Sequence, residues 1–209
     1  MSEMDEVKSR GYGLERSLAL TDGVFAISMT LLVLDLAVPV LSLGASSGDL
    51  WKELSAEGLN FINFLLSFLI AGVWWNGHHH DFGLLRRSDS TLRWLNMLFL
   101  IWIALLPFFT KIFHYINLSI AVMLYALDQA GAGFFLALSW WYAIRNHRLV
   151  DEELSDNTIN FILIRNLVPP IIFSISMIIA IVNPTIAIIF WFIMIPLIRL
   201  IRLFERKSS

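Results

Sequence analysis

The side chains most able to do chemistry lie in the first apolar stretch of the chain, residues 16–35. Arg16, Thr21 and Asp22 open this stretch, and Asp35 closes it. Ionisable groups at membrane depth each cost roughly 2.5–3.5 kcal/mol on insertion scales, so they must face protein or water. The pattern therefore indicates either a membrane helix that handles ions or an ordinary first transmembrane helix with polar ends, and the spacing leaves both readings open.

Three consecutive histidines followed by an acid, His78 to Asp81, form a second candidate cluster. Adjacent residues on a helix point about 100° apart, so a single helix cannot aim His78, His79 and His80 at one ion. Helical metal sites place histidines at i and i+3 or i+4 instead. We therefore expect no metal here. The cluster is either a polar helix end at the lipid headgroups or a source of a buried histidine that hydrogen-bonds to the first helix.

Motifs for other chemistries are missing from the sequence. There is no GxSxG, HExxH or P-loop pattern and no TVGYG filter, and the chain has no cysteine. We therefore expect neither an enzyme nor a cofactor. The remaining polar residues within apolar segments are typical of hydrogen bonds between helices, and Arg165 either reaches the membrane surface or pairs with an acid. These residues are Asn63, Asn96, Asp128, Arg165 and Asn166.

Composition places these residues in a membrane. The 209 residues are 57% hydrophobic and only 15% charged, whereas soluble domains have about 45–50% apolar and about 25% charged residues. The net charge of −2 favours no nucleic-acid partner. The acidic, polar segment 1–15 does not look like a cleaved signal peptide.

The hydropathy pattern predicts an all-α integral membrane protein with six transmembrane helices in one domain, residues 1–209. Each apolar segment approaches the roughly 20 residues that cross a bilayer, and helices satisfy their own backbone groups there. We expect a Gly/Ser-rich loop from Ser42 to Glu57, a break or kink at Pro169-Pro170, and a close-packing surface at residues 130–133. The expected spans are about 17–40, 58–81, 91–113, 118–145, 157–182 and 185–204, followed by a tail, 205–209.

The basic residues predict the orientation of these spans. Of the 15 Lys and Arg residues, only Lys52 and Lys111 fall in loops on one side, and Arg165 lies within a span. The positive-inside rule therefore places both termini in the cytoplasm, as in a multi-pass protein of a cell membrane.

One face of the first helix carries an apolar stripe made of Ile27, Thr30, Leu31 and Leu34. At about 100° per residue these four side chains lie within about 60° of Ile27, and Asp22 points well away from them. A proton or substrate relay would place its acids on the aqueous face. The stripe itself fits a pore lining, a lipid-facing surface or a packed surface.

The motif Arg16-x-x-x-Leu20-Thr21-Asp22 resembles the RxxxFSD signature of the transmembrane protein 175 family of potassium channels, with Leu for Phe and Thr for Ser. The resemblance continues through Trp75-x-x-His78-His79, Asp89 to Asn96, and Leu105 to Phe108. His80-Asp81 departs from the Arg-Leu expected in bacterial members. Because animal members carry two six-helix repeats and dimerise, the single repeat of this chain implies a homotetramer in the lipid bilayer of a bacterial cell.

The resemblance implies conduction of K⁺ and other monovalent cations through a pore lined by the first helix, without a carbonyl filter. Ile27, Leu31 and Leu34 would form apolar rings, and Thr30 would lie at their edge. A polar network at the cytoplasmic end would fix this helix. Its members would be Arg16, Thr21, Asp22, Trp75 and His78 or His79. The alternative function is a proton-coupled transporter that uses Asp22, Asp35 and His78/His79 as a relay.

Overall fold

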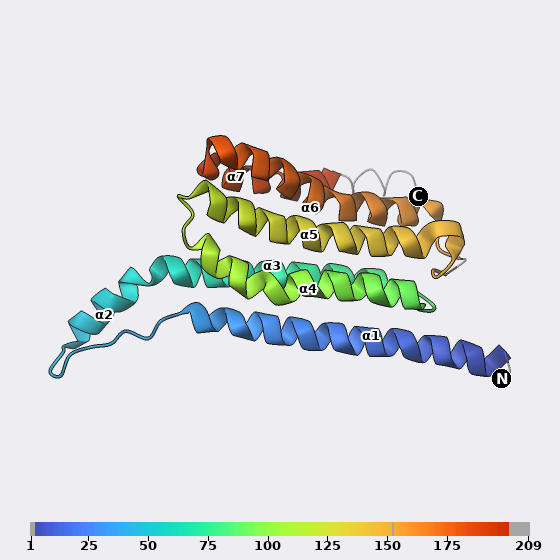
Figure 1. Ribbon diagram of the computed structural model, residues 1–209, viewed down its shortest axis with the longest axis horizontal. Helices are drawn as coiled ribbons and strands as arrows, with labels where there is room; N and C mark the ends of the chain where they lie inside the picture. Colours follow the sequence, from blue (N-terminus) through green and yellow to red (C-terminus); the bar gives the residue numbers. More distant parts are fainter. Residues whose placement is uncertain (1–2, 152, 201–209) are drawn as a thin grey trace.

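Long helices run side by side through nearly all of the computed structural model, which describes residues 3–151 and 153–200 (Figure 1). Five of them are long and apolar enough to cross a membrane. The prediction of an all-α, multi-span membrane protein is therefore confirmed. These helices are α1 (Glu3–Leu31), α3 (Gly58–Gly83), α4 (Ser90–Phe113), α5 (Ser119–Ile144) and α6 (Asp156–Val182).

The sixth predicted span, 185–204, is shorter in its described part. The helix α7 (Pro184–Trp191) is followed by a turn at residues 192–193 and a helical stretch over residues 194–200. Together they form an apolar helix from Pro184 to Leu200. Asn183 starts α7, because its side chain accepts hydrogen bonds from the Thr185 and Ile186 amides at 2.9 and 3.1 Å. The predicted end of this span and the tail 205–209 lie outside the described residues.

The first helix does not have the predicted bounds of about 17–40. It starts at Glu3, and after Leu31 it tightens into the 3-10 helix η1 (Leu32–Asp35) before the chain becomes extended at Leu36. Glu, Met, Lys and Arg in the N-terminal segment are good helix formers, which lengthens α1 at its start. Pro39 disfavours helical backbone in the residue before it, which shortens the helix at its end.

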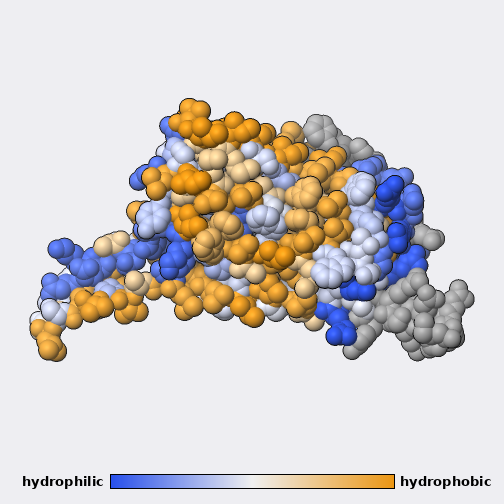
Figure 2. Space-filling model, viewed as in Figure 1, coloured by the Kyte–Doolittle hydropathy of each residue, from blue (hydrophilic) through white to orange (hydrophobic). Residues whose placement is uncertain are grey.

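The expected loop from Ser42 to Glu57 contains a helix, α2 (Ser47–Ala56). Ser46 and Asp49 form a reciprocal capping box in which the Asp49 amide donates to Ser46 Oγ at 3.2 Å and the Ser46 amide to Asp49 Oδ2 at 2.8 Å. Hydrogen bonds from the Ser46 backbone and hydroxyl lower the pKa of Asp49. Helix α2 and the irregular segment 36–46 before it form an arm, the α2 arm, which extends beyond the five long helices (Figure 1). Hydrophilic and hydrophobic side chains lie next to one another on this arm (Figure 2), and its exposed apolar residues include Val40, Leu43 and Trp51.

Helix α5 is the centre of the protomer and packs against α4 on one side and α6 on the other. Small residues permit this packing: Gly131 faces the Trp102 ring of α4, and a Cβ on Gly133 would lie 2.6 Å from Pro170 Cδ of α6. Helix α6 continues through Pro169 and Pro170, so of the expected break or kink the break does not occur. Membrane helices tolerate proline where neighbouring groups satisfy the freed backbone.

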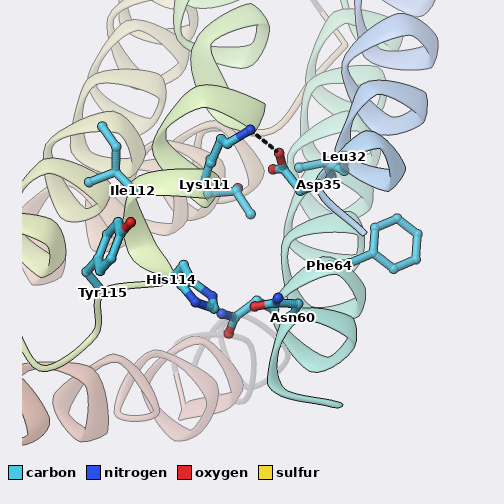
Figure 3. Close-up of a pocket in the computed structure, with 10 residues that line it drawn as sticks. Leu32, Asp35, Asn60, Phe64, Lys111, Ile112, His114 and Tyr115 are labelled. Carbon is cyan, nitrogen blue, oxygen red and sulfur yellow. Dashed lines mark ion pairs between the residues drawn. The ribbon is translucent and has the colours of Figure 1, made fainter. Parts of the chain in front are cut away.

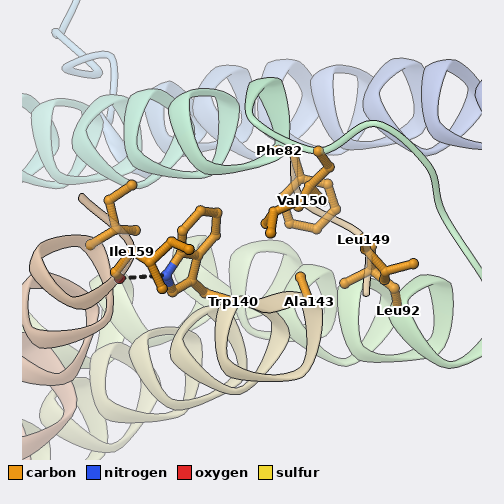
Figure 4. Packing of buried hydrophobic residues seen from close by; sticks show 9 residues of the cluster. Phe82, Leu92, Trp140, Ala143, Leu149, Val150 and Ile159 are labelled. Carbon is orange, nitrogen blue, oxygen red and sulfur yellow. Dashed lines mark hydrogen bonds between the residues drawn. The ribbon is translucent and has the colours of Figure 1, made fainter. Parts of the chain in front are cut away.

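The turn between α3 and α4 and the linker between α5 and α6 meet at one end of the bundle, which we call the basic end because Arg86, Arg87, Arg145 and Arg148 lie there. Leu85 and Val150 form an isolated antiparallel bridge, and Arg86 pairs with Asp151 at 2.7 Å. Beneath this connection is a cluster that includes Phe82, Leu92, Trp140, Ala143, Leu149, Val150 and Ile159 (Figure 4).

Asp89, in the turn before α4, links the start of α4 to α5 and to the linker between α5 and α6. Its carboxylate accepts from the Leu92 amide at 2.9 Å and the Tyr142 hydroxyl at 2.7 Å, and Arg148 Nη2 lies 3.2 Å from it. Desolvation opposes ionisation, but these hydrogen bonds and the arginine outweigh it and lower the pKa of Asp89.

Candidate functional site

One face of α1 is packed against the rest of the protomer. The buried positions recur every three or four residues, as expected for one side of a helix. Ser28 Oγ donates to the Ile103 carbonyl of α4 at 2.6 Å, and the rings of Phe25 and Phe99 lie 6.0 Å apart. These contacts hold the middle of α1 against α4. The buried residues of this face are Ser17, Thr21, Phe25, Ser28 and Leu32.

The opposite face of α1 is not covered by the other residues that the structure describes. Ile27 is 62% exposed, Leu31 42% and Leu34 73%. Together with Thr30, they form the stripe identified in the sequence, and we call this face the open face of α1. An apolar strip along a membrane helix that none of the described residues covers can meet lipid, another copy of the chain or a pore.

Thr30 is the polar member of the open face. Its Oγ1 lies 3.0 Å from the Ala26 carbonyl and 2.8 Å from the Ile27 carbonyl of the same helix. The hydroxyl proton is therefore directed back into the helix. Because a hydroxyl also carries two acceptor lone pairs, the Thr30 oxygen can offer a ligand to a cation on the open face.

A buried polar chain joins three helices near the start of the membrane-spanning part of α1. Asn96 of α4 donates to Thr21 Oγ1 of α1 at 3.1 Å, and its Oδ1 lies 2.8 Å from His78 Nε2 of α3. Thr21, His78 and Asn96 are each at most 2% exposed. The His78 ring stacks between Phe82 and Phe99. This chain fixes the register of α1 against α3 and α4.

A second contact lies beside this chain, nearer the surface. Trp75 Nε1 of α3 donates to Asp22 Oδ1 of α1 at 2.8 Å, and the His79 ring stacks on Trp75 with centroids 5.5 Å apart. Arg16 has an exposed side chain about one and a half turns before Asp22. We call the Thr21–Asn96–His78 chain and the Asp22–Trp75 contact the polar anchor of α1.

Sequence reasoning did not place Asn96 in the anchor. An asparagine within an apolar segment indicates a hydrogen bond between helices, but the sequence does not say to which helix. The hydrogen bonds decide this, because Asn96 uses its amide group as donor and its carbonyl oxygen toward the histidine.

The third histidine belongs to a different cluster. His80 Nδ1 lies 3.3 Å from Asp81 Oδ1, and the buried Asp81 pairs with Arg165 and accepts from Asn166 at 2.6 Å. Arg165 therefore pairs with an acid rather than reaching for the surface. His78, His79 and His80 enter three different environments, in agreement with the 100° spacing of helical side chains.

Asp35 lies at the other end of α1, which we call the cavity end. It is thirteen residues from Asp22, which corresponds to about 20 Å along a helix. Its Oδ1 lies 3.4 Å from Lys111 Nζ, and it lines a cavity of about 290 Å³ with residues of α3 and α4 (Figure 3). The structure therefore does not bring Asp35 together with Asp22, His78 or His79.

These features define the class of the protein as a multi-pass helical membrane protein whose first helix is anchored on one face and uncovered on the other. The family described as endosomal/lysosomal potassium channel TMEM175 matches residues 16–107. A potassium channel of Streptomyces collinus is 33% identical over 141 residues, which cover 65% of this chain and 67% of that protein. The chain therefore belongs to the TMEM175 family.

Two further comparisons describe the extent of this relationship. The mouse endosomal/lysosomal proton channel TMEM175 is 37% identical over 98 residues, 44% of this chain but only 20% of that protein. The crystal structure of a lysosomal potassium-selective channel TMEM175 homolog from Chamaesiphon minutus superposes with a TM-score of 0.74 at 23% identity, covering 93% of this chain and 98% of that one. The superposition extends the common fold over almost the whole chain.

Proposed function

We propose that this protein is a potassium channel in which four copies surround a central pore lined by the open face of α1. The observation that carries the proposal is the uncovered stripe of Ile27, Thr30, Leu31 and Leu34 on the face of α1 that points away from the protomer core. Membership of the TMEM175 family supports it, since bacterial relatives of this chain are potassium channels.

Ion passage is controlled by the apolar rings that four copies of Ile27, Leu31 and Leu34 form. A hydrated cation in such a ring loses water contacts and gains no ligand, so a narrow ring stops ions by dewetting. Thr30 supplies the side-chain oxygen between the rings. Because its proton is directed to helix carbonyls, its lone pairs remain for the cation.

The polar anchor holds the pore-lining helix in position. A rotation of α1 would move Ile27 off the pore axis, and it would also break the bonds that Asn96 makes to Thr21 and Trp75 makes to Asp22. Breaking the bond from Asn96 leaves its buried amide group unpaired, at about 1–3 kcal/mol. The anchor therefore favours one orientation of the open face.

The membrane and the orientation follow from the charges. The basic end holds arginines from two connections, and the positive-inside rule places it in the cytoplasm of a bacterial cell. Both termini then lie on the cytoplasmic side.

The proton-coupled relay has no comparable support. Asp22 and Asp35 lie about 20 Å apart along the helix. Phe25 and Leu32, both buried apolar residues, lie between them on the packed face. His78 is enclosed between aromatic rings.

Flux measurements on the purified protein in liposomes test the proposed function. We expect K⁺ to leave the vesicles down its own concentration gradient, without a gradient of any other ion to drive it. The efflux should be much slower when the vesicles contain Na⁺ in place of K⁺. Uptake of K⁺ that requires an opposing proton gradient, or equal K⁺ and Na⁺ fluxes, would contradict a potassium-selective channel.

A further inference from the structure

One line of apolar side chains runs along the length of α5 on a side that no described residue covers. Side chains seven positions apart on a helix differ in direction by only about 20°. Helix α5 is the most buried of the five long helices, because α4 and α6 pack against it, yet each side chain of this line is at least 40% exposed. We call the line the α5 stripe; its members are Ile120, Leu127, Phe134 and Trp141.

The part of the α5 stripe nearest the basic end lies at the depth of one lipid leaflet. A leaflet contributes about half of the 30 Å hydrocarbon core, which corresponds to about ten helical residues. Trp141 is a residue type that is enriched where the hydrocarbon meets the headgroups. The ten residues before it include Phe134. Phe134 and Trp141 therefore offer aromatic surface to an acyl chain of this leaflet.

The α5 stripe ends at an arginine that lies over its last aromatic ring. Arg145 follows Trp141 by four residues, and its Cζ lies 5.5 Å from the centre of the Trp141 ring. The guanidinium is therefore folded back along α5, toward the membrane. Arg145 is exposed and forms no ion pair with an acid in the described part of the chain. A planar guanidinium can bind a phosphate through two parallel N–H groups.

The acids closest to this arginine along the chain and across the turn have other cationic partners. Asp89 Oδ2 lies 3.2 Å from Arg148 Nη2, and Asp151 Oδ2 lies 2.7 Å from Arg86 Nη2. Arg87 Nε donates to the Arg148 carbonyl at 3.0 Å, and among the described residues the Arg87 guanidinium has no acid partner either. Two guanidinium groups at this end are thus available to an anion.

The other described acids of the linker between α5 and α6 belong to its α6 side. Asp156 is the first residue of α6 and lies 3.5 Å from His147 Nε2, and the exposed Glu153 precedes it by three residues. On the face shown in Figure 2, hydrophobic side chains cover the middle of the bundle, and hydrophilic ones gather at the end opposite the α2 arm. A ligand with both an acyl chain and an anionic group fits such a boundary.

We propose that the end of α5 is a binding site for an anionic phospholipid, with the phosphate against the Arg145 guanidinium and an acyl chain along Trp141 and Phe134. A zwitterionic headgroup fits less well, because its own ammonium group offsets the phosphate charge. Helix α4 lies between α5 and α1 (Figure 1). The site is therefore separate from the proposed pore and goes beyond the channel function.

Native mass spectrometry of the purified full-length protein tests the site by titration with dioleoyl phosphatidylglycerol or dioleoyl phosphatidylcholine, two lipids with the same acyl chains. We expect the anionic phosphatidylglycerol to bind more tightly. Arg145→Gln should weaken its binding about fivefold, as for one arginine at an anionic membrane surface. The same variant should bind phosphatidylcholine as the wild type does, which also shows that it is folded. Glycerol phosphate in excess should not displace the lipid, because it has no acyl chain.

Arg199→Gln is the matched control, because it removes an exposed arginine from the helical stretch after α7. It should bind phosphatidylglycerol as the wild type does. Equal losses in Arg199→Gln and Arg145→Gln would show a general attraction to positive charge and no site on α5. Equal affinity for the two lipids, or normal phosphatidylglycerol binding by Arg145→Gln, would also overturn the proposal. Displacement by glycerol phosphate would show that the anion alone is recognised, without the acyl chain.

Discussion

At the level of single residues, α1 divides its chemistry between two faces. Thr21 and Ser28 use their hydroxyls within the protomer, through Asn96 and the Ile103 carbonyl. Thr30 directs its proton into its own helix and leaves its oxygen on the open face. A threonine on the packed face of α1, Thr21, thus joins the helix to α4, whereas a threonine on the open face, Thr30, has an oxygen that an ion could reach.

Ile27→Asn tests the apolar ring. In a pore, the amide wets the constriction, so K⁺ flux should rise in an intact assembly. Ile101→Asn on α4, where Ile101 is 51% exposed, is the matched control and should leave flux unchanged. The measurements are K⁺ flux in liposomes and the native mass of the assembly. An Ile27→Asn protein that assembles normally and conducts K⁺ as the wild type does would exclude Ile27 from the gate.

Thr30→Val tests the hydroxyl ligand at nearly constant volume. The substitution removes one oxygen from each of the four copies, and a combined preference of about 1 kcal/mol for K⁺ over Na⁺ would correspond to a roughly fivefold lower K⁺/Na⁺ flux ratio. Thr30→Ser keeps the oxygen and should preserve the ratio. If Thr30→Val has the same K⁺/Na⁺ flux ratio as the wild type, the Thr30 hydroxyl does not contribute to ion selectivity.

Asn96→Ala tests the polar anchor. It leaves His78 Nε2 without its partner and removes a donor from Thr21 Oγ1, which keeps its bond to the Ser17 carbonyl at 2.9 Å. The free energy of unfolding should therefore fall by about 1–3 kcal/mol. Asn117→Ala, at an exposed loop position, should have little effect. Denaturant unfolding in detergent measures both, and equal stabilities would show that the buried chain does not hold α1.

At the level of elements, α5 determines how closely the helices approach. It lies between α4 and α6, and its glycines replace side chains where Trp102 and Pro170 press against it. The outer helices α1 and α3 bury less of their surface within the protomer. This arrangement leaves α1 available for contacts beyond its own chain.

Gly133→Ala tests this close approach. The added methyl group would lie 2.6 Å from Pro170 Cδ, so α6 must shift, at about 1–3 kcal/mol. Gly72→Ala on α3 meets open space and should be neutral or stabilising by up to about 1 kcal/mol. Thermal unfolding in the same detergent compares the two, and a Gly133→Ala protein as stable as Gly72→Ala would contradict the packing argument.

At the level of the whole molecule, the proposed tetramer gives the uncovered stripe of α1 a place at the central axis. A single protomer exposes Leu34 at 73% and Ile27 at 62% along one line. Four copies around an axis would bring these lines together, whereas a monomer would leave them to lipid.

Single-cysteine cross-linking tests the assembly, because the chain has no cysteine of its own. Leu34→Cys should cross-link into covalent dimers with a short bifunctional thiol reagent, because each chain then carries one thiol, and the native mass of the uncross-linked assembly should be that of a tetramer. Ile178→Cys on α6, 68% exposed and on the other side of the bundle from α1 (Figure 1), should stay monomeric. The reverse pattern would place α1 at the lipid and α6 at the axis.

The amino-acid sequence alone determined the membrane class, most helix positions and the family. Apolar runs of bilayer length leave few alternatives, so α3, α4, α5 and α6 lie within a few residues of their predicted bounds. The membership of the stripe on α1 also followed from the sequence, because it depends only on the helical repeat, whereas its exposure is a result of the structure. The errors at Pro39 and in α2 arose where local effects, a proline and a Ser46–Asp49 capping box, outweighed hydropathy.

Only the tertiary structure decided which polar groups meet. Asn96 reaches Thr21 across 75 residues and Arg165 reaches Asp81 across 84, and such pairs depend on the relative rotation and height of different helices. The close approach of α5 and α6 likewise depends on Gly133 of one helix facing Pro170 of the other. The cavity beside Asp35 depends on three helix ends at once. A sequence pattern reports the faces of one helix, whereas these features arise from the register between helices.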